Sequence, residues 1–184
     1  MALSLLLHYP LLYYLMLATL SQDLSQPEYI HVLINPLPVY GLAMGIIGLI
    51  IALVQRSRSA QVATLALILF SGAIAWPVVH YGEEGYDRVL SMSDDQGQAW
   101  LKVHNHRADE LAWSFYVLAG VAAVAIFAPL KWPKVATALA LIVLLLSFLV
   151  LGLGGYIAHA GGKIRHREFR NGPAPPVPVE EGES

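Results

Sequence analysis

The sequence contains no cysteine and few charged residues, and both absences restrict what the protein can be. Without a thiol, the chain can form no disulfide, no thiolate-ligated iron–sulfur cluster and no structural zinc site built on cysteine. Charged residues make up only 13% of the 184 residues, whereas soluble domains carry about 25%. The formal net charge of −2 lacks the basic excess typical of nucleic-acid-binding proteins. We therefore expect neither an ordinary soluble domain nor a nucleic-acid partner.

Long apolar stretches are what the sequence has instead of charge. Hydrophobic residues account for 57% of the chain, and the mean hydropathy is +0.57. Four stretches reach the length of about 20 residues that a membrane helix needs: residues 36–54, 60–79, 111–127 and 135–157. We expect Asn35 to cap the first, and a longer helix that starts near Asp94 or Asp95 to contain the third.

Short connections join these stretches in pairs. QRSRS links the first to the second, and APLKWPK links the third to the fourth. Such short links make consecutive helices antiparallel neighbours. The sequence therefore predicts an all-α integral membrane protein, an up-down-up-down four-helix bundle over residues 30–166, in contact with the lipid bilayer.

Two terminal segments flank the predicted bundle. Residues 1–29 contain an apolar helix, which Pro10 interrupts, and a linker. This helix lacks a basic n-region and a cleavage site, so we interpret it as retained, either in the membrane interface or as a fifth span. Residues 167–184 are Pro-rich and acidic, and we expect them to be extended and disordered unless a partner holds them. The lysine and arginine distribution does not determine the orientation of the bundle.

Histidines gather at one end of the predicted bundle. The chain has seven, and up-down topology brings six of them to one interfacial layer: His31, His80, His104, His106, His159 and His166. Ligand sites in helical bundles are commonly built in this way, from side chains on facing helices. His166 lies in a basic run and is expected at the surface, and His8 is isolated and receives no role.

Imidazole is a suitable ligand for haem iron, copper and zinc. We expect the axial ligands of a b-type haem to come from His80, His104 and His159, with His31 in reserve. His104 and His106 differ by about 200° around a helix. His104 has the more apolar neighbours, so we expect it to face the bundle core. A solvated histidine without a ligand is the alternative at each position.

Glycines precede two of these histidines. Gly155 and Gly152 lie one and two turns before His159 on the same helical face. Gly72 lies about two turns before His80. These small residues fit two interpretations: they clear space for a flat macrocycle beside the histidine, or they let membrane helices pack closely without a ligand.

Carboxylates also lie close to the histidines in sequence. Glu84 follows His80 by four residues, and Glu110 follows His106 by four residues. Pairs at this spacing fit a di-metal centre or a proton relay to a quinone, and they also fit an ordinary solvated loop. The full Glu-x-x-His pattern of ferritin-like di-iron sites is absent.

The lead-in NPLPVYGLAMG, followed by four spans, resembles a broad bacterial family of uncharacterised four-helix membrane proteins. Members begin the first span with a His-Pro-Leu-Leu-Val-His-Phe-Pro pattern and end the fourth with a Gly-Gly turn. Some members are fused to, or encoded near, Rieske-type and cytochrome proteins, which implies a redox setting. The likeness covers roughly residues 30–164. Asn35 and Tyr40 stand where the family pattern has histidines, so this chain cannot reproduce their chemistry there.

Two functions from different classes fit these observations. The first is a membrane electron-transfer subunit with one or two b-type haems, which exchanges electrons with a redox partner and quinone. Two histidines on one iron leave no open coordination position, which suits electron transfer. The second is a cofactor-free structural subunit of a larger membrane complex; a pigment-binding or other metal-binding subunit is a third case. The resemblance implies the bacterial inner membrane, and whether the protein is an enzyme stays open.

Overall fold

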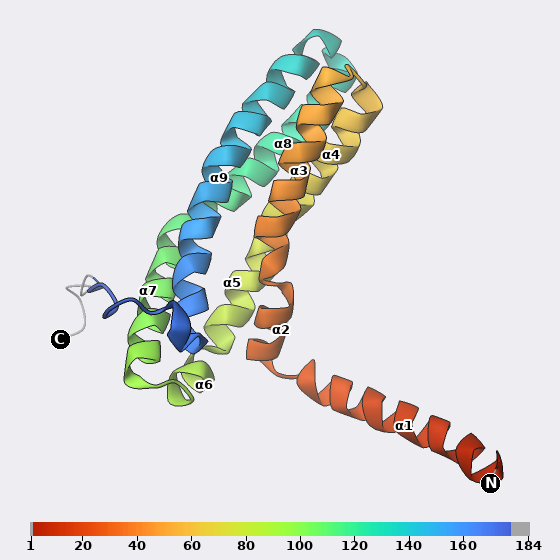
Figure 1. The fold of residues 1–184 in the computed structure, drawn as a ribbon. Helices are drawn as coiled ribbons and strands as arrows, with labels where there is room; N and C mark the ends of the chain where they lie inside the picture. The colour runs from red at the N-terminus through yellow and green to blue at the C-terminus, as the bar shows by residue number, and fades with distance from the viewer. Residues whose placement is uncertain (1, 178–184) are drawn as a thin grey trace.

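The fold is a bundle of four long helical spans. A computed structural model describes residues 2–177, with side chains described for residues 12–14 and 16–177. All regular secondary structure in this part of the chain is helical, and four segments are long and apolar enough to cross a membrane: Pro27–Val54, Arg58–Glu84, Asp95–Lys131 and Pro133–Arg165. Figure 1 shows these spans side by side, with short connections between them. The predicted all-α membrane bundle is confirmed, and the protein is a multi-pass membrane protein.

Most spans consist of more than one helix. The bounds are α2 (Pro27–Ile34) and α3 (Pro36–Val54) in the first, α4 (Arg58–Ala73) and α5 (Ala75–Glu84) in the second, α7 (Asp95–Leu111) and α8 (Trp113–Lys131) in the third, and the short turn η1 (Pro133–Val135) with α9 (Ala136–Arg165) in the fourth. The short α6 (Tyr86–Ser91) connects the two halves, and η2 (Arg167–Phe169) follows α9.

Two spans begin at positions that the sequence singled out. Helix α7 begins at Asp95, where the sequence predicts a start, and Asp94 is its N-cap, with Oδ1 accepting the backbone N–H of Gly97 at 2.8 Å. Asn35 makes no side-chain cap, and this expectation was wrong. Its backbone is helical, and its N–H donates to the carbonyl of His31, because the span already begins at Pro27.

Three spans are interrupted at a similar depth, and the first two interruptions have a common cause. Proline lacks an N–H, so the carbonyl four residues earlier loses its helical partner. Pro38 is four residues after Ile34, the last residue of α2, and Pro77 is four residues after Ala73, the last residue of α4. Each helix therefore ends at the residue whose carbonyl lacks a helical partner.

The third interruption, at Ala112, has no proline. Side chains compete for the backbone there instead. The indole N–H of Trp113 donates to the carbonyl of Glu110 at 2.8 Å, and the hydroxyl of Ser114 donates to that of Leu111 at 2.7 Å.

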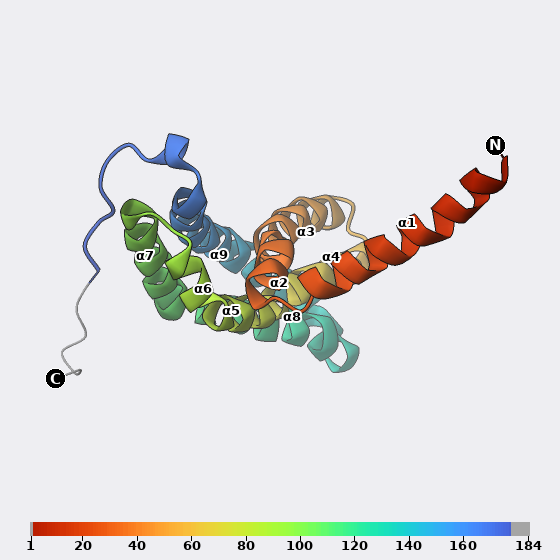
Figure 2. The same ribbon diagram turned by 90° about the horizontal axis from the view of Figure 1, so that it is seen from below.

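The interruptions divide the bundle into a packed end and a split end. In the packed end, α3, α4, α8 and α9 surround a continuous apolar core that includes Leu42, Leu65, Leu118 and Val143. Towards the split end, α2 packs on α5, and α7 packs on α9 around a second cluster at Trp100. Figure 2, seen from this end, shows α7 and α9 on one side and α2 and α5 on the other.

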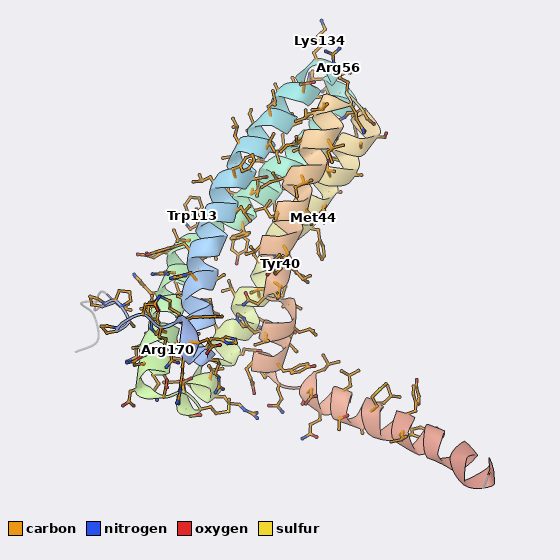
Figure 3. All side chains as sticks on the ribbon, in the orientation of Figure 1. Tyr40, Met44, Arg56, Trp113, Lys134 and Arg170 are labelled. Atoms are coloured by element: carbon orange, nitrogen blue, oxygen red, sulfur yellow. The ribbon has the colours of Figure 1, made fainter. Side chains whose placement is uncertain are left out.

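Glycines of α3 lie in close contact with α4 in the packed end. A Cβ placed on Gly45 would lie 2.6 Å from Cγ1 of Ile68, and one on Gly48 would lie 2.6 Å from Cγ2 of Thr64, both on α4. Small residues at such spacing let membrane helices approach closely. On the outside of the bundle, Tyr40, Met44 and Trp113 project away from the helices and are 59–71% exposed, as expected for lipid-facing side chains (Figure 3).

The terminal segments differ in their contacts. Helix α1 (Ala2–Asp23) extends sideways from the split end of the bundle (Figure 1). Its described large apolar side chains, among them Leu12, Tyr14 and Leu20, are exposed. The choice between an interfacial helix and a fifth span stays a prediction. After η2, Ala174 and Val177 pack against the Trp100 cluster, so this part of the tail lies on the bundle. The rest of the predicted tail, residues 178–184, lies outside the described residues.

Candidate ligand-binding site between two helical pairs

A cavity of about 500 Å³ lies at the split end, between the α2–α5 pair and the α7–α9 pair. Its inner end is apolar and is formed at the helix interruptions by Pro38, Ala75, Ala112 and Phe115. Ligand pockets for small molecules and cofactors usually measure about 300–1,000 Å³. The cavity therefore exists because the helices diverge beyond their interruptions, and it has the size of a cofactor site.

Two histidines line this cavity from opposite helical pairs. His31 belongs to α2 and His104 to α7, both partly buried, and their ring centres are 6.3 Å apart with ring planes at 79°. The Nδ1 of His31 lies 2.8 Å from the carbonyl oxygen of Val78 on α5. The Nδ1 of His104 lies 3.1 Å from that of Ile157 on α9.

The hydrogen bonds fix the protonation of both rings. A carbonyl oxygen only accepts, so each Nδ1 must carry a proton and donate it. In the neutral imidazole the lone pair is then on Nε2, the nitrogen on the far side of the ring. Neither Nε2 has a hydrogen-bond partner among the described side chains and backbone. This is the arrangement of metal-binding histidines, in which one nitrogen is held by the protein and the other binds the metal.

The other two predicted ligands lie on the outside of the same end. His80 is about half exposed, stacks on Trp76 with ring centres 5.4 Å apart, and lies 3.5 Å from Glu84. His159 is exposed on α9. Neither side chain lines the cavity, so of the predicted ligands the structure brings together only His31 and His104. Any role of His80 and His159 as ligands stays a prediction.

The glycine face singled out in the sequence also points outward. Gly152 and Gly155 are exposed, and a Cβ on either would meet no atom within 4 Å. The inward face of α9 instead carries Gly154, where a Cβ would lie 2.8 Å from Cζ of Phe115. Gly72 packs against α8, since a Cβ there would lie 2.6 Å from the carbonyl oxygen of Phe115. It therefore leaves no space for a macrocycle.

Two further histidines, His106 and His166, form pairs with carboxylates. His106 lies 3.5 Å from Glu110, and His166 lies 2.9 Å from Glu168. Within the part of the chain that the structure describes, no group of three or more histidine, aspartate and glutamate side chains is placed to hold a metal ion. The cavity brings together two of the predicted ligands, His31 and His104, and is therefore the candidate site.

Charged and polar side chains line the outer end of the cavity. Nε of Arg88 lies 2.8 Å from Oε1 of Glu28, and Nη1 of Arg165 donates to the carbonyl of Met92 at 3.2 Å. Burial, and secondarily the charge of Asp87, raises the pKa of Tyr86, so this phenol stays a hydrogen-bond donor. The cavity therefore combines apolar inner walls with a polar outer end, which suits an amphipathic ligand.

Comparison of the chain with protein-family models, with curated proteins and with solved structures found no match. The resemblance to the bacterial four-helix family stays a prediction. The class of the protein follows from its own structure: a multi-pass helical membrane protein with a two-histidine cavity at one end of its bundle.

Proposed function

We propose that the protein is a membrane electron-transfer subunit that binds b-type haem between His31 and His104. The observation that supports this proposal is the pair itself: two imidazoles on opposite walls of one cavity, each with Nδ1 bound to a carbonyl. His31 replaces His80 and His159 as the partner of His104, because these two lie outside the cavity.

The spacing of the rings fits one shared metal ion. An imidazole nitrogen binds a transition metal at about 2 Å, so two imidazoles on opposite sides of one ion have ring centres roughly 6 Å apart. The observed separation is 6.3 Å. Two ligands suffice for haem, because the macrocycle supplies the other four, so a larger cluster of protein ligands is not needed.

The cavity also suits the rest of the group. Its inner walls are apolar. At its outer end Arg165 is a cation for the carboxylates of haem, whereas Arg88 is already paired with Glu28. Haem supplies one-electron transfer when it is bound. The chain's own contribution is to hold both imidazoles: the Nδ1–H bonds fix the ring orientations and increase the basicity of Nε2. Holding the iron by both His31 and His104 would favour electron transfer over oxygen chemistry.

The position of the cavity supports exchange with other proteins. It lies at the end of the bundle where the spans meet their polar connections, rather than in the packed core. We propose that electrons pass there between a redox partner, within a larger complex of the bacterial inner membrane, and quinone. One haem fits the described pair; a second would have to use histidines on the outer surface.

The first test is haem binding by histidine variants. We expect the purified full-length protein in detergent to bind haemin and to show a low-spin spectrum, oxidised and reduced. His31→Ala and His104→Ala should each lose this spectrum, because each removes one axial ligand. His80→Ala and His159→Ala are matched controls from the same end and should keep it. Unchanged haemin binding in His31→Ala and His104→Ala would refute the proposal.

The exposed apolar surface of α1 favours a second candidate, a cofactor-free structural subunit. Between Leu12 and Leu20 this helix exposes six large apolar side chains among those described, and it extends away from the bundle (Figure 1). A folded protein that binds no haemin, and that is recovered in a larger complex only when α1 is intact, would support this candidate instead.

A further inference from the structure

Each histidine of the pair is in contact with a glycine on the neighbouring helix. A Cβ on Gly82 of α5 would lie 2.9 Å from Nδ1 and 3.0 Å from Cε1 of His31. A Cβ on Gly161 of α9 would lie 3.1 Å from both Cε1 and Nδ1 of His104. The first distance is too short for any side chain without movement, and the second requires the ring to shift by a few tenths of an ångström.

The two contacts have the same construction. Gly82 is four residues after Val78, and Gly161 is four residues after Ile157, the residues whose carbonyls accept the Nδ1–H bonds. Helical side chains lean towards the N-terminus, so the side chain at position i+4 covers the turn that contains carbonyl i. Glycine at i+4 leaves the second lone pair of that carbonyl open to a neighbouring helix. The imidazole occupies the space that a side chain would otherwise fill.

We propose that Gly82 and Gly161 are positioning residues for the histidine pair. By leaving the carbonyls of Val78 and Ile157 open, they hold His31 and His104 as Nδ1–H tautomers with Nε2 free. Each pair of spans thus supplies one half of the site, a histidine near its start and an open carbonyl near its end. The expected effect of these glycines on haem affinity rests on the proposed function. Their effect on the tautomer of His31 and His104 does not depend on haem.

Alanine variants test this role against two kinds of control. Gly82→Ala and Gly161→Ala add a methyl group in the space that the imidazole needs to reach the carbonyl. Gly155→Ala adds a methyl group in open space. Gly45→Ala adds a methyl group at a close helix contact far from the histidines, and so measures the effect of packing alone. All four are made in the full-length chain, with folding followed by circular dichroism and thermal melting.

The first measurement needs no haem. Nitrogen NMR of ¹⁵N-histidine-labelled protein in detergent distinguishes a protonated from an unprotonated ring nitrogen. We expect His31 and His104 to be protonated at Nδ1 in the wild-type chain, in Gly155→Ala and in Gly45→Ala. Gly82→Ala should change the signals of His31, and Gly161→Ala those of His104. Wild-type rings protonated at Nε2, or unchanged rings in both site variants, would overturn the inference.

The second measurement is haemin affinity. Loss of a hydrogen bond that orients a metal ligand costs roughly 10- to 100-fold in affinity. We expect a loss of this order in Gly82→Ala and a smaller one in Gly161→Ala, where the contact is looser. If Gly82→Ala does not fold, Gly161→Ala alone decides. Haemin binding equal to that of the two controls refutes the positioning role, while the haem proposal survives. If the wild-type chain binds no haemin, the haem proposal fails and the NMR result still decides on the positioning role.

Discussion

At the scale of single residues, Arg58 compensates for a proline in the packed end. Pro129 lies inside α8 and has no N–H for the carbonyl of Ala125, four residues earlier. Nη2 of Arg58, at the start of α4, donates to that carbonyl at 3.0 Å. A charged donor from a neighbouring span therefore satisfies a carbonyl that the helix itself leaves open.

Removal of this donor has a measurable cost. We expect Arg58→Ala to lower the free energy of unfolding by about 1–3 kcal/mol, because a partly buried carbonyl loses a charge-assisted hydrogen bond. In a Pro129→Ala background the residue at 129 has its own N–H, so the same substitution should cost less. Denaturant unfolding of the four proteins in one detergent gives both values. An equal loss in both backgrounds would show that Arg58 does not act through the carbonyl of Ala125.

At the scale of helices, ion pairs of Asp94 with Arg167 and Arg170 join the ends of α7 and α9. Asp94 caps α7, and Nη1 of Arg170 lies 2.9 Å from both of its carboxylate oxygens. The same guanidinium donates to the last carbonyls of α9, through Nε to Lys163 at 2.7 Å and through Nη2 to Ile164 at 2.5 Å. The pair thus caps two helices at once and holds together the helices that position His104.

The pH dependence of this contact follows from the carboxyl group. Bonds from Arg170, and secondarily from the N–H of Gly97, hold the pKa of Asp94 below its usual range. A carboxyl with a lowered folded pKa stabilises the fold above its unfolded pKa, about 3.9, and loses this effect as the pH falls through the folded value. We expect hydrogen exchange at the start of α7 to accelerate below about pH 4. Asp94→Asn should abolish the dependence, and Asp95→Asn should keep it.

At the scale of the whole molecule, a ligand between the histidines would join two parts that otherwise meet little. The α2–α5 and α7–α9 pairs have few direct contacts below the helix interruptions. Haemin at about 100 times its dissociation constant should stabilise the protein by about 2.7 kcal/mol. Hydrogen exchange should slow in α2 and α7 together, and His31→Ala should show neither effect. Protection confined to one pair would contradict a ligand shared between them.

The sequence allowed prediction of the architecture, and it indicated the end of the bundle at which the candidate site lies. Span length, short connections and topology are properties of the chain itself, and they placed six histidines in one layer. The sequence did not reveal which histidines face each other. His159 was favoured over His31 because of the glycines beside it, but the inward face of α9 is the one with Gly154. That choice depends on how α9 is rotated against α7 and α8, which helical periodicity leaves open.

Two features of the candidate site correspond to residues other than histidine in the sequence, namely prolines and glycines. Pro38 and Pro77 mark the interruptions that open the cavity, whereas the interruption at Ala112 depends on hydrogen bonds from Trp113 and Ser114. Gly82 and Gly161 have matching places in the sequence, because each lies near the end of a span and the span before it carries a histidine near its start. Their role depends on the backbone carbonyl one turn earlier, and a carbonyl is present at every residue, so the sequence does not mark it.

The two half-sites have the same order of parts along the chain. His31 is separated from its carbonyl at Val78 by 47 residues, and His104 from its carbonyl at Ile157 by 53. Both units run in the same direction, with the histidine near the start of one span and the open carbonyl near the end of the next. Duplication and fusion of a gene for one such hairpin would produce this order.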